Sequence, residues 1–484
     1  MKKVLSLAAC SALVLGFAAT ASAVHVEAPA ETSAVVAKGG LVTIDGAVRH
    51  RGFSRTHTLA KDKDGSTSGY DTRVRLGVTA QTSDAITGRI LLENGSGSGD
   101  TNPWGESTIT NLFAGGEKKG TLEILEAWIQ YQPANYGVKV GHMPLALGKN
   151  LFFDHTGSGD DAIVGYINPT DATHVAALTI KFAESFGNRA DTIALENLFG
   201  ADLDGDGGTG TANNIVTGTP GPGQANSLSA LGGMDDSDDI DGYVLLATHK
   251  ISDALKLGGN YTYLHNSAVG MAFQNLGLTL DGKVGGFSYG LDGEFQFGDL
   301  IDVPGYTVGV EGMAFQGTAG MDLNGVALGA LVGYGTGHDI NSTSNDTDAF
   351  INFLTDTRYQ STMVGYIHAV PGAFNGGKNS GLSNLTLVQL SAAGKTTCPM
   401  TGKDLSLKAR ANYLQLSEEV VTNGDDDLGF ELEGFADWKL GNGLVYGIEA
   451  AYLWAGDGWD MTPGNGIDET EDGYYLRHRL ELQF

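Results

Sequence analysis

Apolar and polar residues alternate along most of the chain after residue 40. The clearest runs are LVTIDGAVRHRGF (41–53), YDTRVRLGVTAQ (70–81), ITGRILLEN (86–94) and GNGLVYGIEAAYLW (441–454). Alternation with a period of two over roughly 8–12 residues is typical of β-strands whose two faces meet different surroundings. The pattern therefore predicts an all-β protein.

The connections between the expected strands are of two kinds. Short ones are found at 83–85, 132–136, 251–254 and 441–443. Long polar ones are found at 95–120, 144–171, 199–238, 417–427 and 455–472. Short turns at one end and long loops at the other are typical of outer-membrane barrels, whose apolar faces contact lipid. We therefore expect a transmembrane antiparallel β-barrel with short periplasmic turns and long extracellular loops.

The expected barrel occupies residues 41–484 and contains about 18 strands, a size at which side chains alone cannot fill the interior. Sixteen strands remain possible, because the polar stretch 336–357 falls where a short turn is expected. Residues 24–40 show no clear period, and we expect them to form a loose leader. Aromatic residues at strand ends fit the girdles that mark the membrane interfaces: Tyr131, Tyr136, Tyr261, Tyr263, Tyr306, Tyr452, Trp454 and Tyr474.

The first 23 residues differ from the rest of the chain. Two lysines precede the apolar run LSLAACSALVLGFAATA (5–21), and ASA (21–23) fits the small-residue rule for cleavage. The stretch LAAC (7–10) resembles a lipoprotein box but follows the lysines too closely. We expect a secretory signal peptide at 1–23 and a mature chain that begins at Val24. No later stretch approaches the ~18 apolar residues of a membrane-spanning helix.

The chain is strongly acidic, with 29 Lys and Arg against 57 Asp and Glu, a net charge of −28. Removal of Lys2 and Lys3 with the signal peptide would bring the net charge to −30. This balance disfavours nucleic-acid partners. The mature chain would keep one cysteine, Cys398, so an internal disulfide is excluded and we expect an inert loop thiol.

Arginines occur on strands that closure of the barrel would bring together. If apolar residues face lipid, the opposite parity faces the lumen. The first strand then contributes Arg49, Arg51 and Arg55, the second Arg73 and Arg75, the third Arg89, and the last Arg477 and Arg479. Because the last strand of a closed barrel pairs with the first, these four strands would form one contiguous arginine arc.

Acidic residues with the inward parity are expected elsewhere in the barrel. They are Asp292, Glu294, Glu311, Glu431, Glu433, Asp437 and Glu449, while Lys408 and Arg410 form a smaller basic pair. Two interpretations of the arginine arc are open: its charges satisfy acidic partners across strands, or they guide anions. We prefer the second, because guanidinium stays charged and binds carboxylate or phosphate bidentately. Random scatter would also not place the arginines on adjacent strands.

The segment GHMPLALGKNLFFDHTGSGDDAIVGY (141–166) is unusually apolar for an exposed loop. Either it packs over the rim, or it folds into the lumen and narrows the pore. In the second case His142, Phe152 and Asp154 are candidates for lining the constriction.

At this point the chain resembles the alginate-export type of outer-membrane porin. The resemblance rests on the signal peptide, the alternating strands, the terminal Phe484 and the Gly-His-Met-x-Leu-x-x-Gly segment (141–148) before an acidic loop. That family typically has Gly-Arg where this chain has Gly141-His142. The resemblance implies a barrel of near eighteen strands with an arginine-lined lumen for anionic solutes, and a terminal aromatic residue recognised by the barrel-assembly machinery. It does not imply that alginate is the solute.

A weaker signal is found at Asp202, Asp204 and Asp206, which match the opening of a calcium loop with Gly207 at its sixth position. The twelfth position is Asn213 instead of Glu. A Ca²⁺ ion in an extracellular loop and a solvated loop without metal are both open, and no other cofactor is expected. Acidic loops such as 423–429 could share divalent ions with lipopolysaccharide.

The sequence does not favour an enzyme, because His50, His142, His249 and His478 occur singly within strand patterns. We expect a porin in the outer membrane of a Gram-negative bacterium that passes small anionic solutes by passive diffusion. Its partners would be membrane lipid, lipopolysaccharide and the barrel-assembly machinery. The alternative is a barrel that sheathes a protein partner, such as an electron-transfer cytochrome conduit.

Overall fold

The computed structural model describes most of the chain beyond its N-terminal region. The described residues are 33–37, 40–56, 59, 65–94, 122–183, 239–267, 269–303, 306–338, 346–354, 362–365, 370–373, 381–420, 424–460 and 470–484. The predicted signal peptide (1–23) lies outside this part of the chain. In the described ranges, no helix is long and apolar enough to cross a membrane.

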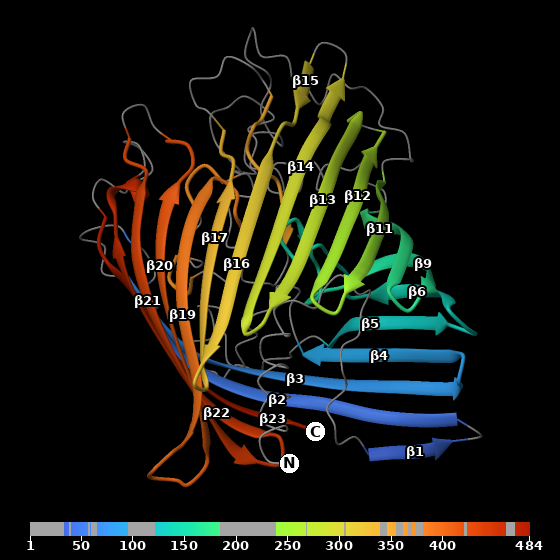
Figure 1. The fold of residues 1–484 in the computed structure, drawn as a ribbon, viewed down its shortest axis with the longest axis horizontal. Helices are drawn as coiled ribbons and strands as arrows, with labels where there is room; N and C mark the ends of the chain where they lie inside the picture. The colour runs from blue at the N-terminus through green and yellow to red at the C-terminus, as the bar shows by residue number, and fades with distance from the viewer. Residues whose placement is uncertain are drawn as a thin grey trace, which may run out of the picture.

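Eighteen antiparallel strands form one continuous sheet (Figure 1). They are β2 (Gly40–Thr56), β3 (Ser66–Ser83), β4 (Ile86–Asn94), β5 (Leu122–Tyr131), β6 (Tyr136–Met143), β9 (Asp160–Thr170), β10 (Thr173–Ala183), β11 (Ile240–Ser252), β12 (Leu255–Asn266), β13 (Met271–Val284), β14 (Phe287–Val303), β16 (Met313–Leu323), β17 (Val326–Gly335), β19 (Leu385–Thr397), β20 (Asp404–Leu416), β21 (Asp427–Gly441), β22 (Leu444–Ala455) and β23 (Gly473–Gln483). Each strand pairs with its sequence neighbour in this series.

The sheet closes on itself, because β23 pairs antiparallel with β2 from Ala47↔Gln483 to Arg55↔Tyr475. Figure 1 shows these two strands side by side, although they come from opposite ends of the chain. Phe484 continues the pairing beyond β23, since its backbone N–H donates to the Gly46 carbonyl and its carbonyl accepts the Gly46 N–H. The predicted eighteen-strand barrel is therefore confirmed, and the sixteen-strand alternative is wrong.

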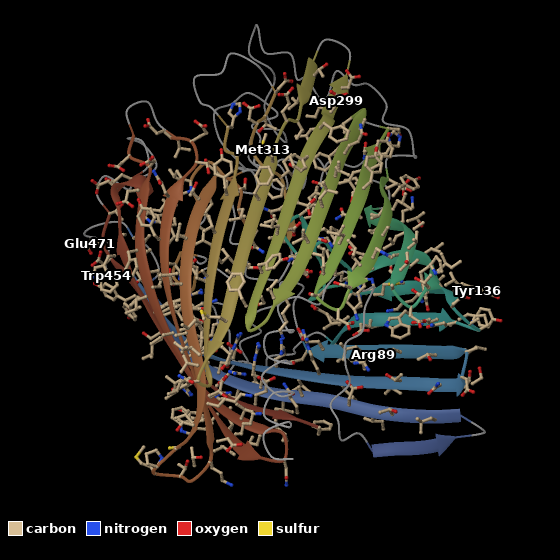
Figure 2. All side chains as sticks on the ribbon, in the orientation of Figure 1. Arg89, Tyr136, Asp299, Met313, Trp454 and Glu471 are labelled. Carbon is tan, nitrogen blue, oxygen red and sulfur yellow. The ribbon has the colours of Figure 1, made fainter. Side chains whose placement is uncertain are left out.

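Side chains alternate between the two faces of the wall. On β23, Leu476 and Leu480 are 51% and 43% exposed on the outer face, whereas Arg477 and Arg479 are half-buried on the inner face. Figure 2 shows Tyr136, at the start of β6, and Trp454, near the end of β22, at the outer margin of the molecule. An apolar outer face with aromatic residues at the strand ends matches a wall that contacts lipid.

The connections separate by length, as the sequence predicts. Turns of a few residues, such as 84–85, 253–254, 285–286 and 324–325, join strands at one end of the barrel. The strands that the long connections join end at the opposite end of the barrel. The stretch 336–357 begins the long connection between β17 and β19, so it belongs to the long-loop end, not to a turn.

Two boundaries and the position of one residue differ from the sequence-based expectation. The expected loop 144–171 ends at residue 159, because β9 and its turn occupy the remainder. Part of the expected leader, β1 (Ser33–Ala37), forms a strand that pairs with β2. Glu311 lies between strands and is exposed, so it does not line the inner wall.

The smaller elements are not part of the ring of eighteen strands. β15 (Tyr306–Gly309) extends the pairing along the upper end of β14. β7 (Ala146–Leu147), β8 (Phe153–Asp154) and β18 (Phe353–Leu354) form a separate small sheet. A short 3₁₀ turn, η3 (Asp457–Trp459), is the only helical element in the described ranges.

The two faces of β19 predict opposite responses to substitution. Leu390 is 60% exposed on the outer face, so Leu390→Arg is expected to lower the free energy of unfolding by about 2–4 kcal/mol, because it places a cation in lipid. The neighbouring lumen-facing change Ser391→Gln should have little effect. Urea unfolding of the barrel in lipid bilayers measures both, and equal destabilisation by the two changes would contradict the assigned faces.

Candidate functional site

The inner face of β23, β2, β3 and β4 carries the arginine arc. Arg49, Arg51, Arg55, Arg73, Arg75, Arg89, Arg477 and Arg479 all have the inward parity on these four adjacent strands. The structure therefore brings together the residues that the sequence analysis groups. Arg410 lies on β20, apart from the arc.

Most arginines of the arc are engaged by carboxylates. Asp71 lies 2.9 Å from Arg51 and 4.0 Å from Arg49, measured from the nearest oxygen to the guanidinium nitrogen. Glu93 contacts both Arg73 and Arg75. Cross-strand ion pairs are therefore part of the wall, as the first of the two interpretations expects.

The ion pairs continue on either side of these strands. Arg89 binds Asp45 at 2.7 Å and Glu126 at 3.4 Å. Arg477 contacts Glu449, and Arg479 binds Asp437 and Glu481 at 2.8 Å each: these pairs join β21, β22 and β23. The network ties the seam between the last and first strands to its neighbours on both sides.

Positive charge nevertheless exceeds negative charge within the arc. On the inner face of β23, β2, β3 and β4 there are eight arginines and four carboxylates, an excess of four positive charges. The carboxylates are Asp45, Asp71, Glu93 and Glu481. The flanking strands add Glu126, Glu449 and Asp437, which pair with Arg89, Arg477 and Arg479, so the excess is a property of these four strands alone.

Two cross-strand positions place arginine directly opposite arginine. Arg49 is the register partner of Arg73, and Arg51 is the register partner of Arg479. Like charges directly opposite each other in a sheet are destabilising. These two arginine pairs are therefore not explained by ion pairing across the strands.

The arginines differ in their access to the interior space. Arg73, Arg75 and Arg479 have side chains that are 20%, 27% and 24% exposed, whereas that of Arg51 is 3% exposed. The first three guanidinium groups are therefore more accessible from the interior space than that of Arg51. By comparison, Arg51 and its partner Asp71 are buried in the wall, where they stabilise it.

A smaller basic pair lies on β20, where Lys408 and Arg410 have the inward parity. Arg410 contacts Glu433 and lies with its Cζ 4.8 Å from the ring centroid of Phe435. Its side chain is only 11% exposed. Arg410 is held by its neighbours and faces the interior space less than Arg75 does.

The segment between β6 and β9 folds into the barrel. Leu147, Leu151 and Phe152 are buried, and the Phe152 ring stacks 6.0 Å from that of Phe273, an inward residue of β13. The Lys149 backbone N–H donates to Asp292 of β14 at 2.9 Å. We call residues 144–159 the first inner segment.

A second inner segment comes from the connection between β17 and β19, with described residues 346–354, 362–365 and 370–373. The two inner segments meet where β8 pairs parallel with β18. Five phenylalanine rings with centroids 5.5–6.1 Å apart join the segments to β10 and β13: Phe152, Phe153, Phe182, Phe273 and Phe353. This cluster gives the interior an apolar core of its own.

Glu431 of β21 fastens the second inner segment to the wall. Its carboxylate is fully buried and accepts backbone N–H groups from Met363, Val364 and Gly365 at 2.6, 2.9 and 3.0 Å. Three charge-assisted hydrogen bonds to consecutive amides satisfy both the buried charge and the segment's backbone.

The three candidates for the constriction have different positions. Phe152 lies in the phenylalanine cluster. Asp154 is buried and accepts hydrogen bonds from Asn150 and Thr156, so it holds the first inner segment in shape. His142 has the outward parity and bonds Asp161, whose side chain is 74% exposed, so the expectation that it lines a constriction is wrong.

The candidate calcium ligands Asp202, Asp204 and Asp206 lie outside the described residues, so that hypothesis stays untested. Within the described ranges, no group of three or more His, Cys, Asp or Glu side chains is arranged to hold a metal ion. Cys398 is buried in the turn between β19 and β20.

A Gly-x-Ser-x-Gly run is present at 286–290 but does not form a nucleophile elbow, which requires a strand-to-helix turn. It begins in the turn between β13 and β14, and Ser288 of β14 donates a hydrogen bond to the Gly320 carbonyl. The serine therefore takes part in strand packing.

Several interior residues are not identified from the sequence. They include Asp71, Glu93 and Glu126, which contact the arginines, and Lys139, which lies 3.8 Å from the Trp128 ring centroid. Inward parity on the neighbouring strands would have marked each of them as wall residues. Which arginine each carboxylate contacts depends on the strand register, which the sequence does not show.

The role of Glu431 can be tested by substitution. Glu431→Ala leaves three buried amides without an acceptor, at about 1–3 kcal/mol for each unsatisfied group. We expect faster proteolysis within the second inner segment, and Glu431→Gln, which keeps one acceptor oxygen, should fall between Ala and the native residue. Limited proteolysis of the folded barrel measures the order, and equal rates for all three proteins would contradict the assigned contact.

No family model and no curated protein sequence matches the chain. Among solved structures it is similar to a BenF-like porin from Pseudomonas fluorescens Pf-5 (TM-score 0.53, 11% identity, covering 92% of this chain and 99% of that one). It is also similar to Pseudomonas aeruginosa OpdK solved with vanillate (TM-score 0.54, 10% identity, 92% and 98%) and to OccK9 (OpdG) (TM-score 0.51, 12% identity, 92% and 98%). These likenesses show the fold: the chain has the closed barrel of the large porins.

Proposed function

We propose that the protein is an outer-membrane channel through which small anionic solutes diffuse passively. The observation that carries this proposal is the excess of four positive charges on the inner face of β23, β2, β3 and β4, in a chain with a net charge of −28. The excess lies on one side of the lumen, so the electric field is stronger along that side than along the rest of the wall.

The mechanism is electrostatic guidance along one side of the lumen. Charges lined up along a low-dielectric wall concentrate their field in the adjacent water and raise the local concentration of counter-ions. Arg73, Arg75 and Arg479 offer exposed guanidinium groups that can pass a carboxylate or phosphate from one to the next. Glu93 partly neutralises Arg73 and Arg75, and Asp437 and Glu481 partly neutralise Arg479, which keeps each contact weak enough for release.

The two inner segments give the channel its selectivity for small solutes. They occupy part of the interior and are fixed to the wall at Asp292 and Glu431. A barrel of this size without such segments leaves an open aqueous passage. A solute therefore passes between the inner segments and the arginine arc.

The similar structures support a channel for anions. OpdK was solved with vanillate, which is a carboxylate. The resemblance to alginate-export porins rests on the 141–148 motif and the terminal Phe484, and the solved structures named above are of the Occ and BenF-like kinds. The proposal is therefore a porin for small anions without a named solute.

A sheath for a protein partner is the second candidate. The inner segments occupy space that a partner inside the barrel would need, which favours the solute channel. Purification separates the two candidates: a partner that stays bound through detergent extraction supports the sheath.

Removal of two exposed arginines should change ion selectivity. Arg73→Ser combined with Arg75→Ser removes half of the arc's excess positive charge. We expect the reversal potential in a KCl gradient to move toward cation selectivity, measured on single channels in planar bilayers.

The matched control is Lys408→Ser combined with Arg410→Ser, which removes two inward cations outside the arc. This variant should shift the reversal potential less than the arc variant does. A cation-selective native pore, or a pore that the arc variant leaves unchanged, would contradict the proposed guidance.

Shortening the first inner segment should widen the passage. Replacing residues 147–153 by two glycines removes Phe152 and the turn at Lys149 while keeping β6 and β9. We expect single-channel conductance to rise several-fold with the anion preference retained, because the arginine arc is untouched. An unchanged conductance would show that this segment does not limit the flow of ions.

A further inference from the structure

The outer face of β9, β10, β11 and β12 contains an apolar groove with a volume of about 610 Å³. Its floor is formed by two cross-strand rows, in which Ile163 lies opposite Thr179 and Gly165 lies opposite Ala177. A Cβ atom on Gly165 would meet no described atom within 4 Å. The small side chains at the second row therefore leave a channel that runs along β9 and β10.

Tyrosines of β11 and β12 form one side of the groove. The rings of Tyr243 and Tyr263 stack with their centroids 6.3 Å apart, and the Tyr261 hydroxyl donates to Gln274 Oε1 at 2.6 Å. Tyr243 is 46% exposed and Tyr261 is 38% exposed. A narrow floor with an aromatic side fits an extended hydrocarbon chain, and acyl chains are the molecules that a lipid-facing wall meets.

A row of ionisable side chains crosses the same strands at the upper end of the groove. It lies one outward position beyond Ile163 and Thr179, toward the ends of the strands that carry the long loops. Basic and acidic side chains alternate along it from β6 to β12: His142, Asp161, Lys181, Asp241 and His265. We call these five residues the rim row.

The two central strands of the rim row present opposite charges side by side. Asp161 and Lys181 are register partners, but Asp161 bonds His142 of β6, and Lys181 bonds Asp239 and Asp241 on the side of β11. Their side chains are 74% and 40% exposed. A carboxylate and an ammonium group are therefore accessible directly above the floor of the groove.

The charges of the rim row indicate which headgroup fits. With the histidines uncharged, Asp161, Asp239 and Asp241 exceed the single cation Lys181, so a headgroup that carries phosphate alone would be repelled. A headgroup with both a phosphate and an ammonium group can meet Lys181 with the first and Asp161 with the second. In phosphoethanolamine only two carbon atoms separate the ester oxygen from the nitrogen, a span comparable with the ~4.8 Å between neighbouring strands.

We propose that the groove binds one acyl chain of a lipopolysaccharide whose lipid A carries phosphoethanolamine, with the phosphate at Lys181 and the ammonium group at Asp161. Lipopolysaccharide is the lipid expected at this height, because the groove opens toward the long-loop end, which faces outward in an outer-membrane barrel. The inference rests on the proposed outer-membrane location and not on the proposed passage of anions.

The test uses the purified protein in detergent after removal of bound lipid. Lipopolysaccharide with phosphoethanolamine is added, and native mass spectrometry counts the lipid molecules retained by each barrel. We expect one molecule to be retained and the midpoint of thermal unfolding to rise. Lipopolysaccharide without phosphoethanolamine should require a several-fold higher concentration for half-maximal retention.

Gly165→Leu combined with Ala177→Leu fills the groove with apolar side chains and should abolish retention of both lipids. The matched control is Ala319→Leu combined with Ala330→Leu, which enlarges another pair of opposed, outward-facing small residues, on β16 and β17. The control should retain lipopolysaccharide as the native protein does.

Asp161→Asn tests the headgroup separately from the groove, because Asp161 is exposed and lies above the floor. This variant should bind the two forms of lipopolysaccharide equally, since the carboxylate that meets the ammonium group is lost. Lys181→Gln should weaken the binding of both forms.

Four results would overturn the proposal. The native protein could retain no lipopolysaccharide, or it could retain the two forms equally. The groove variant could bind as the native protein does. Phosphatidylethanolamine could bind as tightly as the modified lipopolysaccharide, which would assign the groove to a phospholipid. An oligomer that the groove variant dissociates would assign this face to a second copy of the chain.

Discussion

The pairing of β23 with β2 is the interaction on which the rest of the structure depends. It removes the two free edges that an eighteen-strand sheet would otherwise expose, so the backbone groups along both strands are paired. In a lipid environment unpaired backbone groups cost several kcal/mol each, and only a closed barrel satisfies them with strands. Closure also assembles the interior, because Arg477 and Arg479 become neighbours of Arg49 and Arg51 only through this seam.

The interior combines two different kinds of stabilisation. The wall that carries the arginine arc is held by ion pairs on each side of the seam, such as Arg51–Asp71 and Arg479–Asp437. The inner segments are fastened to the wall by the phenylalanine cluster and by backbone amides that bind Asp292 of β14 and Glu431 of β21. The proposed path of solutes follows the arc, where the side chains of Arg73, Arg75 and Arg479 stay partly exposed.

Much of the barrel could be predicted from the sequence, whereas its interior contacts could not. Alternation is a local property, so the outward position of Leu480 and the inward position of Arg479 follow from their neighbours in the chain. The contact between Phe152 and Phe273 joins two segments that are far apart in sequence, and no local sequence pattern predicts it. The position of His142 is wrongly predicted because the residue is grouped with the loop that follows it. In the structure it continues the outward parity of β6 and bonds Asp161. The stretch 336–357 is also predicted at the wrong end of the barrel, because its position depends on counting every earlier strand correctly.

The central claim is that the closed barrel conducts and that its arginine arc favours anions. Single-channel recording of the purified, unmodified protein in a planar bilayer with a KCl gradient tests it most directly. The account predicts discrete current steps whose reversal potential shows that chloride passes more readily than potassium. A barrel that inserts but carries no current, or one that prefers potassium, would contradict it.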